Sequence, residues 1–137
     1  MTERELMRIK KNREKLKALK AEIDDLSYKS LAPGQQLTGM PFVSGTSDKV
    51  GDYVTRITTI EDKYISLLIK TQELEKRAKT FIRSIPDDTI QSILYLRYIN
   101  GADDLIIADA VGMKGNYRES LVRKIVHSFF LDILLYL

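Results

Sequence analysis

Apolar residues recur along this chain at the three- and four-residue intervals of amphipathic helices, whereas the alternating pattern of β-strands is absent. The three prolines, at positions 33, 41 and 86, leave long stretches in which helices can continue without a break. We therefore predict an all-α fold. Residues 1–85 should form two long coiled-coil helices with a loop between them, and residues 86–137 a unit of three shorter helices.

The longest apolar pattern predicts a helix over residues 48–85. Its apolar positions follow a seven-residue repeat that only Thr71 interrupts, which is the pattern of a coiled coil. A capping hydroxyl and an early carboxylate in the segment 46–48, Thr-Ser-Asp, predict the start of this helix. The seam consists of Val50, Tyr53, Ile57, Ile60, Tyr64, Leu67, Leu74, Ala78, Phe81 and Ile85.

A second, narrower seam predicts a helix over residues 3–30. Asn12 stands where the repeat would place an apolar residue; it either is buried and fixes the register or lies on a solvated helix end. Residues 31–47 contain two prolines and three glycines and predict a long loop, which allows either a hairpin within one chain or exchange between two chains. The seam consists of Ile9, Leu16, Leu19, Ile23 and Leu26.

The apolar stripe of the second long helix is wider than pairing with one other helix requires. Val54, Leu68 and Ile82 lie directly beside its seam, so an isolated hairpin would leave apolar surface exposed. We therefore expect self-association through residues 6–26 and 50–85, as a homodimer.

Residues 86–137 show the pattern of a helix-turn-helix unit. The pair Asn100-Gly101 predicts the end of a first helix, with Gly101 at positive φ, and a second short amphipathic helix follows. After a glycine-rich turn over residues 112–116, apolar pairs predict a third helix over residues 117–137. The alternative is three packed core helices without DNA affinity, an arrangement far commoner than a DNA reader.

If this unit binds DNA, the contacts should come from the third helix and the turn before it. A step of about 100° per residue divides that helix into an inward apolar face and an outward polar face, which could equally be an ordinary solvated surface. The residues predicted to point inward are Leu121, Val122, Ile125, Val126 and Phe129. The predicted DNA contacts are Lys114, Asn116, Tyr117, Arg118, Ser120, Arg123, Lys124 and His127.

The net charge of +3 is unevenly distributed along the chain. Residues 1–31 carry nine basic and six acidic side chains, whereas residues 86–137 carry five basic and seven acidic ones. Because nonspecific DNA affinity grows with the number of phosphates neutralised, the helix-turn-helix unit should anchor few phosphates per copy.

Residues suited to catalysis or metal binding are sparse. Cysteine is absent, His127 is the single histidine, and no carboxylate pair has a nucleophile or base nearby. We therefore expect no enzyme activity, no metal and no cofactor, with His127 at the edge of the core or facing a phosphate. The charged N-terminus lacks the apolar core of a signal peptide, and the apolar run Phe129–Leu137 is too short to cross a bilayer. We expect a cytoplasmic protein without membrane contact.

Two motifs occur together in this chain. Residues 44–52, Ser-Gly-Thr-Ser-Asp-Lys-Val-Gly-Asp, open the second long helix, and residues 94–101, Leu-Tyr-Leu-Arg-Tyr-Ile-Asn-Gly, precede Ile107-Ala108. With these motifs, residues 44–112 resemble small phage regulators of the ArpU/RinA-like kind, whose C-terminal part is similar to the fourth region of bacterial sigma factors. The resemblance implies transcriptional regulation in a phage or prophage of a Gram-positive host, through DNA binding, contact with RNA polymerase, or both.

The chain departs from this family pattern where DNA would be read. Position 118 is Arg where the relatives carry a buried Val, and the preceding turn is about three residues longer. The run Phe129–Leu137 is also more apolar than a recognition helix requires, so this helix either packs under a partner chain or serves protein contact. We predict a DNA-binding transcriptional regulator. The alternative is a protein-interaction module that binds and inhibits a host protein without DNA affinity.

Overall fold

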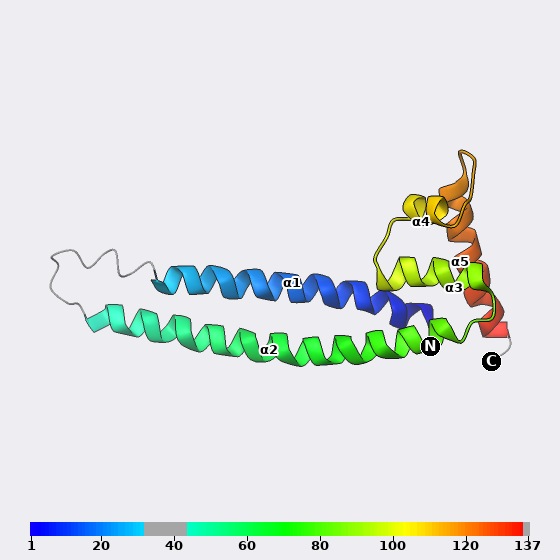
Figure 1. Cartoon of the computed structure of the whole chain (residues 1–137). Coiled ribbons are helices and arrows are strands. Elements are labelled where there is room, and N and C mark those ends of the chain that lie inside the picture. Colours follow the sequence, from blue (N-terminus) through cyan, green and yellow to red (C-terminus); the bar gives the residue numbers. More distant parts are fainter. Residues whose placement is uncertain (32–43, 136–137) are drawn as a thin grey trace. The chain divides into compact units, whose positions relative to one another are not determined.

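A computed structural model describes residues 1–31 and 44–135, and every regular element within these ranges is a helix (Figure 1). The all-α prediction is confirmed. The predicted loop 31–47 lies largely outside the described residues, as does the side chain of Val50. The elements are α1 (Glu3–Leu31), α2 (Ser44–Arg83), α3 (Asp88–Leu94), the π-helical turn η2 (Tyr95–Ile99), α4 (Asp104–Ala110) and α5 (Arg118–Leu135).

The N-terminal end of α1 is closed by a capping box. The backbone N–H of Thr2 donates to Glu5 Oε2 at 2.9 Å, and the backbone N–H of Glu5 donates to Thr2 Oγ1 at 3.2 Å. The hydrogen bond from Thr2 is the main cause that lowers the pKa of Glu5. This reciprocal pair orders the first turn of the chain.

The predicted start of α2 at residue 48 is wrong, because the helix already begins at Ser44. Residues 46–48 therefore lie within the helix and do not mark its start. At its other end α2 stops at Arg83, three residues before Pro86, whose ring would disrupt a continuing helix.

The residues of the chain group into two compact units by their contacts. One, the middle unit, contains Asn12–Lys70, and the other, the terminal unit, contains Met1–Lys11 together with Thr71–Leu137. Both long helices therefore contribute one part to each unit. Residues 1–11 and 71–85, which the sequence pattern assigns to the long helices, share a core with the three-helix segment.

In the middle unit α1 and α2 run side by side in opposite directions (Figure 1). Leu16 and Leu26 of α1 and Ile60 of α2 are buried there. Asn12 is also buried, with 8% of its surface exposed, so the alternative of a solvated helix end is wrong. The remaining seam residues of this unit whose side chains are described are partly buried, namely Leu19, Ile23, Tyr53, Ile57, Tyr64 and Leu67.

The terminal unit has one apolar core, to which the first residues of the chain contribute directly. Leu6 and Ile9 of α1 are fully buried in it, together with side chains from α2, α3, η2, α4 and α5. Burial of two such side chains stabilises the folded state by several kcal/mol, at about 2 kcal/mol each. The other buried members are Leu74, Ala78, Ile82, Ile85, Ile93, Leu94, Tyr98, Ile99, Ile107, Ala108, Val122, Val126 and Phe130.

Two expectations about apolar side chains are corrected by this core. Ile82 was expected to be covered through self-association, but the three-helix segment of the same chain covers it, and it is fully buried. Leu121 was expected to point inward, but it is 45% exposed. The inward face of α5 is centred on Val122, Val126 and Phe130, and Leu121 lies one residue, or about 100°, away from Val122.

The helical segment formed by α3 and η2 has a defined start and end. At its start, the Asp87 carboxylate caps α3 by accepting hydrogen bonds from two backbone N–H groups. At its end, the turn at Gly101 has the geometry that the sequence predicts. After η2, Gly101 takes a φ of 70°, and the backbone N–H of Ala102 donates to the Leu96 carbonyl at 2.9 Å, which closes the helix end. The prediction for Gly101 is confirmed. The π-helical turn η2 was not predicted.

Candidate nucleic-acid interface

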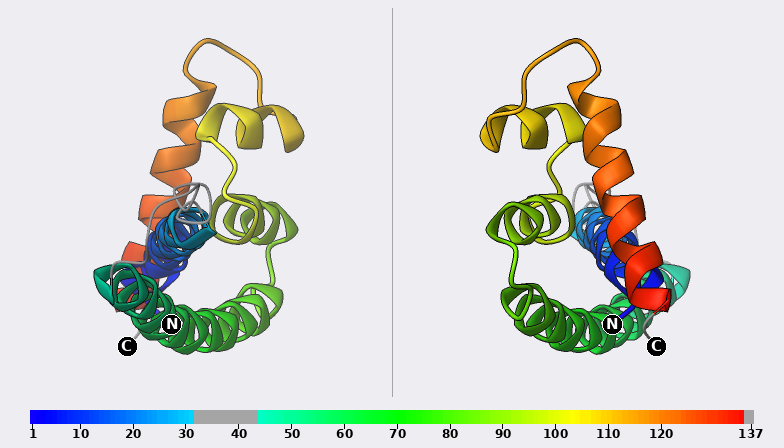
Figure 2. Two further views of the ribbon diagram at one scale, coloured as in Figure 1. Left: turned by 90° about the vertical axis from the view of Figure 1, so that its left-hand side faces the viewer. Right: turned by 90° about the vertical axis from the view of Figure 1, so that its right-hand side faces the viewer.

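The segment from α4 to α5 has the arrangement of two helices joined by a turn. α4 packs against α5, and Figure 2 shows it lying across the N-terminal half of that helix. The turn between them depends on Gly112 and Gly115, with φ values of 82° and 108°. The backbone N–H of Met113 donates to the Ala108 carbonyl at 2.9 Å and so closes the end of α4.

The turn and the start of α5 surround a hollow of about 470 Å³. Seven of the eight predicted DNA contacts are exposed, and Arg118 is partly buried. Tyr117 is 83% exposed although it is a large aromatic side chain. The predicted contacts that line this hollow are Lys114, Asn116, Tyr117, Arg118, Ser120 and Lys124, whereas Arg123 and His127 lie outside its lining.

Arg118 is oriented by its own chain. Its Nε donates to Asp109 Oδ1 at 2.7 Å, and its Nη1 donates to the Gly115 carbonyl at 2.9 Å. The first contact joins the start of α5 to α4, and the second joins it to the turn. Arg118 therefore stabilises the turn between α4 and α5, which the sequence predicts only to be longer than in the family pattern.

Arg123 belongs to an ionic network across three elements. Its Nε donates to Asp104 Oδ2 at 3.0 Å and its Nη2 to Glu119 Oε1 at 2.6 Å. The other Asp104 oxygen accepts a hydrogen bond from Arg97 of η2. Asp104 is the common member and is largely buried, with 14% of its side chain exposed. The hydrogen bond that Arg123 donates to Asp104 contributes most to raising the pKa of Arg123.

The two arginines of the interface form ion pairs, whereas its two lysines do not. Within the described residues, Arg118 and Arg123 each pair with a carboxylate, but Lys114 and Lys124 take part in no ion pair. An arginine engaged with carboxylates must lose those contacts before it reaches a phosphate, whereas an exposed lysine loses mainly water. Lys114 and Lys124 are therefore the side chains best placed to meet phosphate.

His127 and the C-terminal part of α5 are on the surface as well. His127 is exposed, which excludes its predicted place at the edge of the core. In the apolar end of the helix, Phe130 is buried, whereas Leu131, Leu134 and Leu135 are 46%, 65% and 80% exposed. Among the described residues of this run, Phe129, Phe130 and Ile133 pack in or against the core, and Leu131, Leu134 and Leu135 form a leucine surface.

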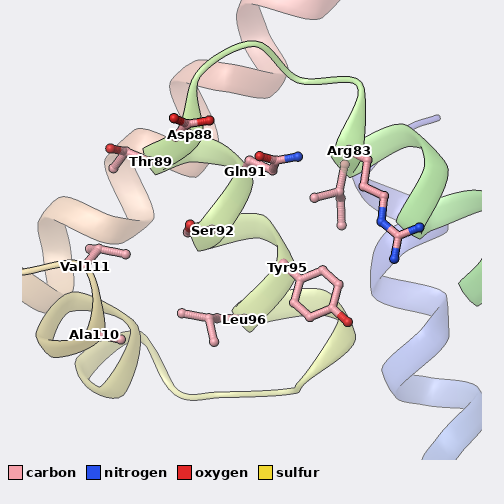
Figure 3. A pocket seen from close by; sticks show the side chains of 10 residues that line it. Arg83, Asp88, Thr89, Gln91, Ser92, Tyr95, Leu96, Ala110 and Val111 are labelled. Atoms are coloured by element: carbon pink, nitrogen blue, oxygen red, sulfur yellow. The ribbon is translucent and has the colours of Figure 1, made fainter.

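A separate groove of about 650 Å³ is lined by the end of α2, by α3 with η2 and by the end of α4 (Figure 3). Leu96 and Val111 supply apolar lining, while Gln91, Ser92 and Tyr95 supply polar groups. Grooves of this mixed character are typical of sites that take small molecules or protein segments.

Neither metal binding nor a membrane span is supported by the described residues. Within residues 1–31 and 44–135, no three His, Asp or Glu side chains are grouped so that they could hold a metal ion. No helix in these ranges is long and apolar enough to cross a membrane. Comparison with protein-family models, curated proteins and solved structures finds no match to this chain.

Sequence reasoning missed the partners of the interface arginines. Asp104 and Arg123 are 19 residues apart, and no local spacing rule connects a residue of one helix with one of the next. The capping box at Thr2 and Glu5 had a recognisable signal, because a Thr followed three residues later by Glu fits that motif.

Proposed function

We propose that the protein is a cytoplasmic DNA-binding regulator of phage or prophage transcription, with the turn before α5 and the first turns of α5 as its DNA-contacting surface. The observation that carries this proposal is the convergence of Lys114, Asn116, Tyr117, Ser120 and Lys124 on one hollow. Such a mixture of cationic, amide, hydroxyl and aromatic groups suits phosphates and base edges together.

The architecture around this surface supports the same proposal. In helix-turn-helix proteins the N-terminal residues of the second helix meet the base edges in the major groove. Here α4 packs against α5 and leaves the start of α5 exposed. The resemblance of residues 44–112 to phage regulators supports the proposal that the DNA binding regulates transcription. It also makes RNA polymerase a further candidate partner.

The charge of the surface favours a homodimer as the DNA-binding form. One copy offers Lys114 and Lys124 as readily available cations, because Arg118 and Arg123 are engaged with carboxylates. Two phosphate contacts provide weak anchoring, and a second copy doubles them on adjacent half-sites.

The test is DNA binding measured by fluorescence anisotropy over a range of salt concentrations. We expect binding whose log affinity falls linearly with log salt. The double variant Lys114→Ala/Lys124→Ala should reduce the steepness of that dependence by about two units per copy, with unchanged helical content. Its matched control is Lys10→Ala/Lys17→Ala on α1, which removes the same charge from exposed positions and should leave the dependence unchanged.

Two outcomes contradict the proposal. A folded protein that binds no duplex at low salt has no DNA function of this kind. If the α1 control changes the salt dependence as much as the α5 variant does, binding is spread over the whole basic surface and α5 is not the DNA-contacting element.

A protein-interaction module is the second candidate, because the leucine surface of Leu131, Leu134 and Leu135 remains exposed. Exposed apolar patches commonly mark protein contacts. Under this candidate, the protein should bind purified host RNA polymerase or another host protein. Leu131→Glu/Leu134→Glu should abolish that binding, while Lys114→Ala/Lys124→Ala should leave it intact. The opposite pattern favours the DNA proposal.

A further inference from the structure

The sequence predicts that Arg118 and Arg123 contact DNA, but in the structure other side chains are better placed to read the bases. Arginine paired with guanine is the commonest specific contact in the major groove. Both arginines of the interface donate to oxygens of their own chain, Arg118 to Asp109 and Gly115, and Arg123 to Asp104 and Glu119. Both typical guanine readers are therefore engaged by oxygens of their own chain, although Arg123 remains exposed.

Lysine can also pair with guanine, but Lys114 and Lys124 are assigned here to phosphates, and the other groups that remain prefer different base pairs. A carboxamide such as that of Asn116 matches the donor and acceptor pair of adenine, and apolar side chains contact the C5-methyl group of thymine. Leu121 is 45% exposed and lies in the lining of the same hollow as Asn116 and Tyr117. Its neighbours in that lining, Lys114 and Lys124, are suited to the flanking phosphates.

We infer that this surface reads A·T base pairs in the major groove, with a thymine methyl group packed against Leu121. The inference rests on the proposed function and names the base pairs that the site would select. It also explains why a leucine stands on the exposed side of α5 among polar residues. Covering this side chain with a methyl group removes apolar surface of both partners from water.

The experiment begins with selection of duplexes from a random library by the full chain. Each thymine of the selected site is then replaced by deoxyuridine, which lacks only the C5-methyl group, and affinity is measured by anisotropy at one fixed salt concentration. We expect replacement of at least one thymine to weaken binding by about fourfold, the change that burial of one methyl-sized group corresponds to.

Leu121→Ala should abolish the difference between thymine and deoxyuridine at that position. The matched control is Leu131→Ala, because Leu131 is equally exposed, at 46%, on the same helix but outside the hollow. This control should keep the full difference. Since Leu121 is not part of the core, loss of folding is not expected, and circular dichroism of each variant verifies this.

Three results overturn the inference while leaving DNA binding itself intact. They are a selected site that consists of G·C pairs only, equal affinity for thymine and deoxyuridine at every position, and undiminished discrimination in Leu121→Ala. Absence of binding to every duplex overturns the proposed function as well, so the two failures are distinguishable.

Discussion

The hydroxyl of Tyr98 donates a hydrogen bond to Glu3 Oε1 at 3.3 Å, across 95 residues of sequence. Tyr98 lies in η2, and Glu3 is the first residue of α1. The ring of Tyr98 also packs edge-on against Phe130 of α5, with centroids 6.3 Å apart. A single buried side chain thus joins the start of the chain to the last helix and makes the first turn of α1 part of the terminal unit.

This contact predicts a specific loss of stability in alkaline solution. Burial, followed by the charge of Glu3, raises the pKa of Tyr98 from 10 to about 12. Because the folded state holds this proton more tightly than the unfolded chain, the stabilisation is complete below pH 10 and is lost as the pH rises toward 12. The loss should approach about 2 kcal/mol. Urea unfolding at a series of pH values measures it.

The control for this effect is Tyr98→Phe, which keeps the ring but has no ionisable hydroxyl. The variant should lose less stability than the wild type between pH 10 and 12, since only other groups titrate there. Parallel pH curves for the two proteins would contradict the assignment.

The N-terminal segment should be required for the stability of the terminal unit. Leu6→Ala and Ile9→Ala each remove a fully buried side chain, and each should lower the free energy of unfolding by about 2–5 kcal/mol. The control is Met7, which lies between them in the same helix but is 53% exposed. Met7→Ala should therefore change stability by about 0.5 kcal/mol or less. Denaturant titration distinguishes these cases, and equal effects of the three substitutions would contradict the buried position of Leu6 and Ile9.

Gly101 should tolerate no β-branched residue. Gly101→Val places a side chain at a φ of 70°, which costs roughly 1–2 kcal/mol through backbone strain, although open space surrounds the position. Gly51 offers the reverse case, because it lies within α2 and Gly51→Ala should raise stability by about 0.5–1 kcal/mol. Thermal unfolding monitored by circular dichroism tests both, and an unchanged melting temperature for Gly101→Val refutes the strain argument.

Asp104 should matter more for stability than the other interface carboxylates. Asp104→Asn removes the charge that two arginines share at a largely buried position, and we expect a loss of about 1–3 kcal/mol. Asp109→Asn removes the carboxylate of an ion pair with a 60% exposed aspartate, which should cost at most about 1 kcal/mol. Chemical denaturation compares the two. A larger effect at Asp109 would show that the network around Asp104 does not stabilise the unit.

Self-association remains a prediction, and the middle unit offers a direct test of it. Val54, Ile65 and Ile69 of α2 are each about half exposed, at 54%, 53% and 51%. Sedimentation equilibrium should show a dimer at micromolar concentration, and Ile65→Glu/Ile69→Glu should convert it to a folded monomer by placing charges in an apolar contact. Lys63→Glu, at an exposed position of the same helix, is the control and should leave the dimer intact. A monomeric wild type would exclude this interface.

The sequence by itself determined the helical class, the approximate extent of the long helices and the turn at Gly101. These features follow from local causes: apolar spacing for α1 and α2, and the need for a residue that accepts positive φ for the turn. The exposure of Lys114 and Lys124 was likewise predictable, because lysine ammonium groups are seldom buried.

Only the tertiary structure decided which side chains share a core and which charges are paired between one helix and the next. Leu6 and Ile9 share a core with the three-helix segment because α2 runs back along α1, so that its last turns pack with the first turns of α1. No local sequence pattern contains this relation. Arg118 and Arg123 looked like DNA contacts, yet Asp109 of α4 engages Arg118 and Asp104 of α4 engages Arg123. Periodicity places an arginine on a helix face, but its partner depends on how that helix packs against the next.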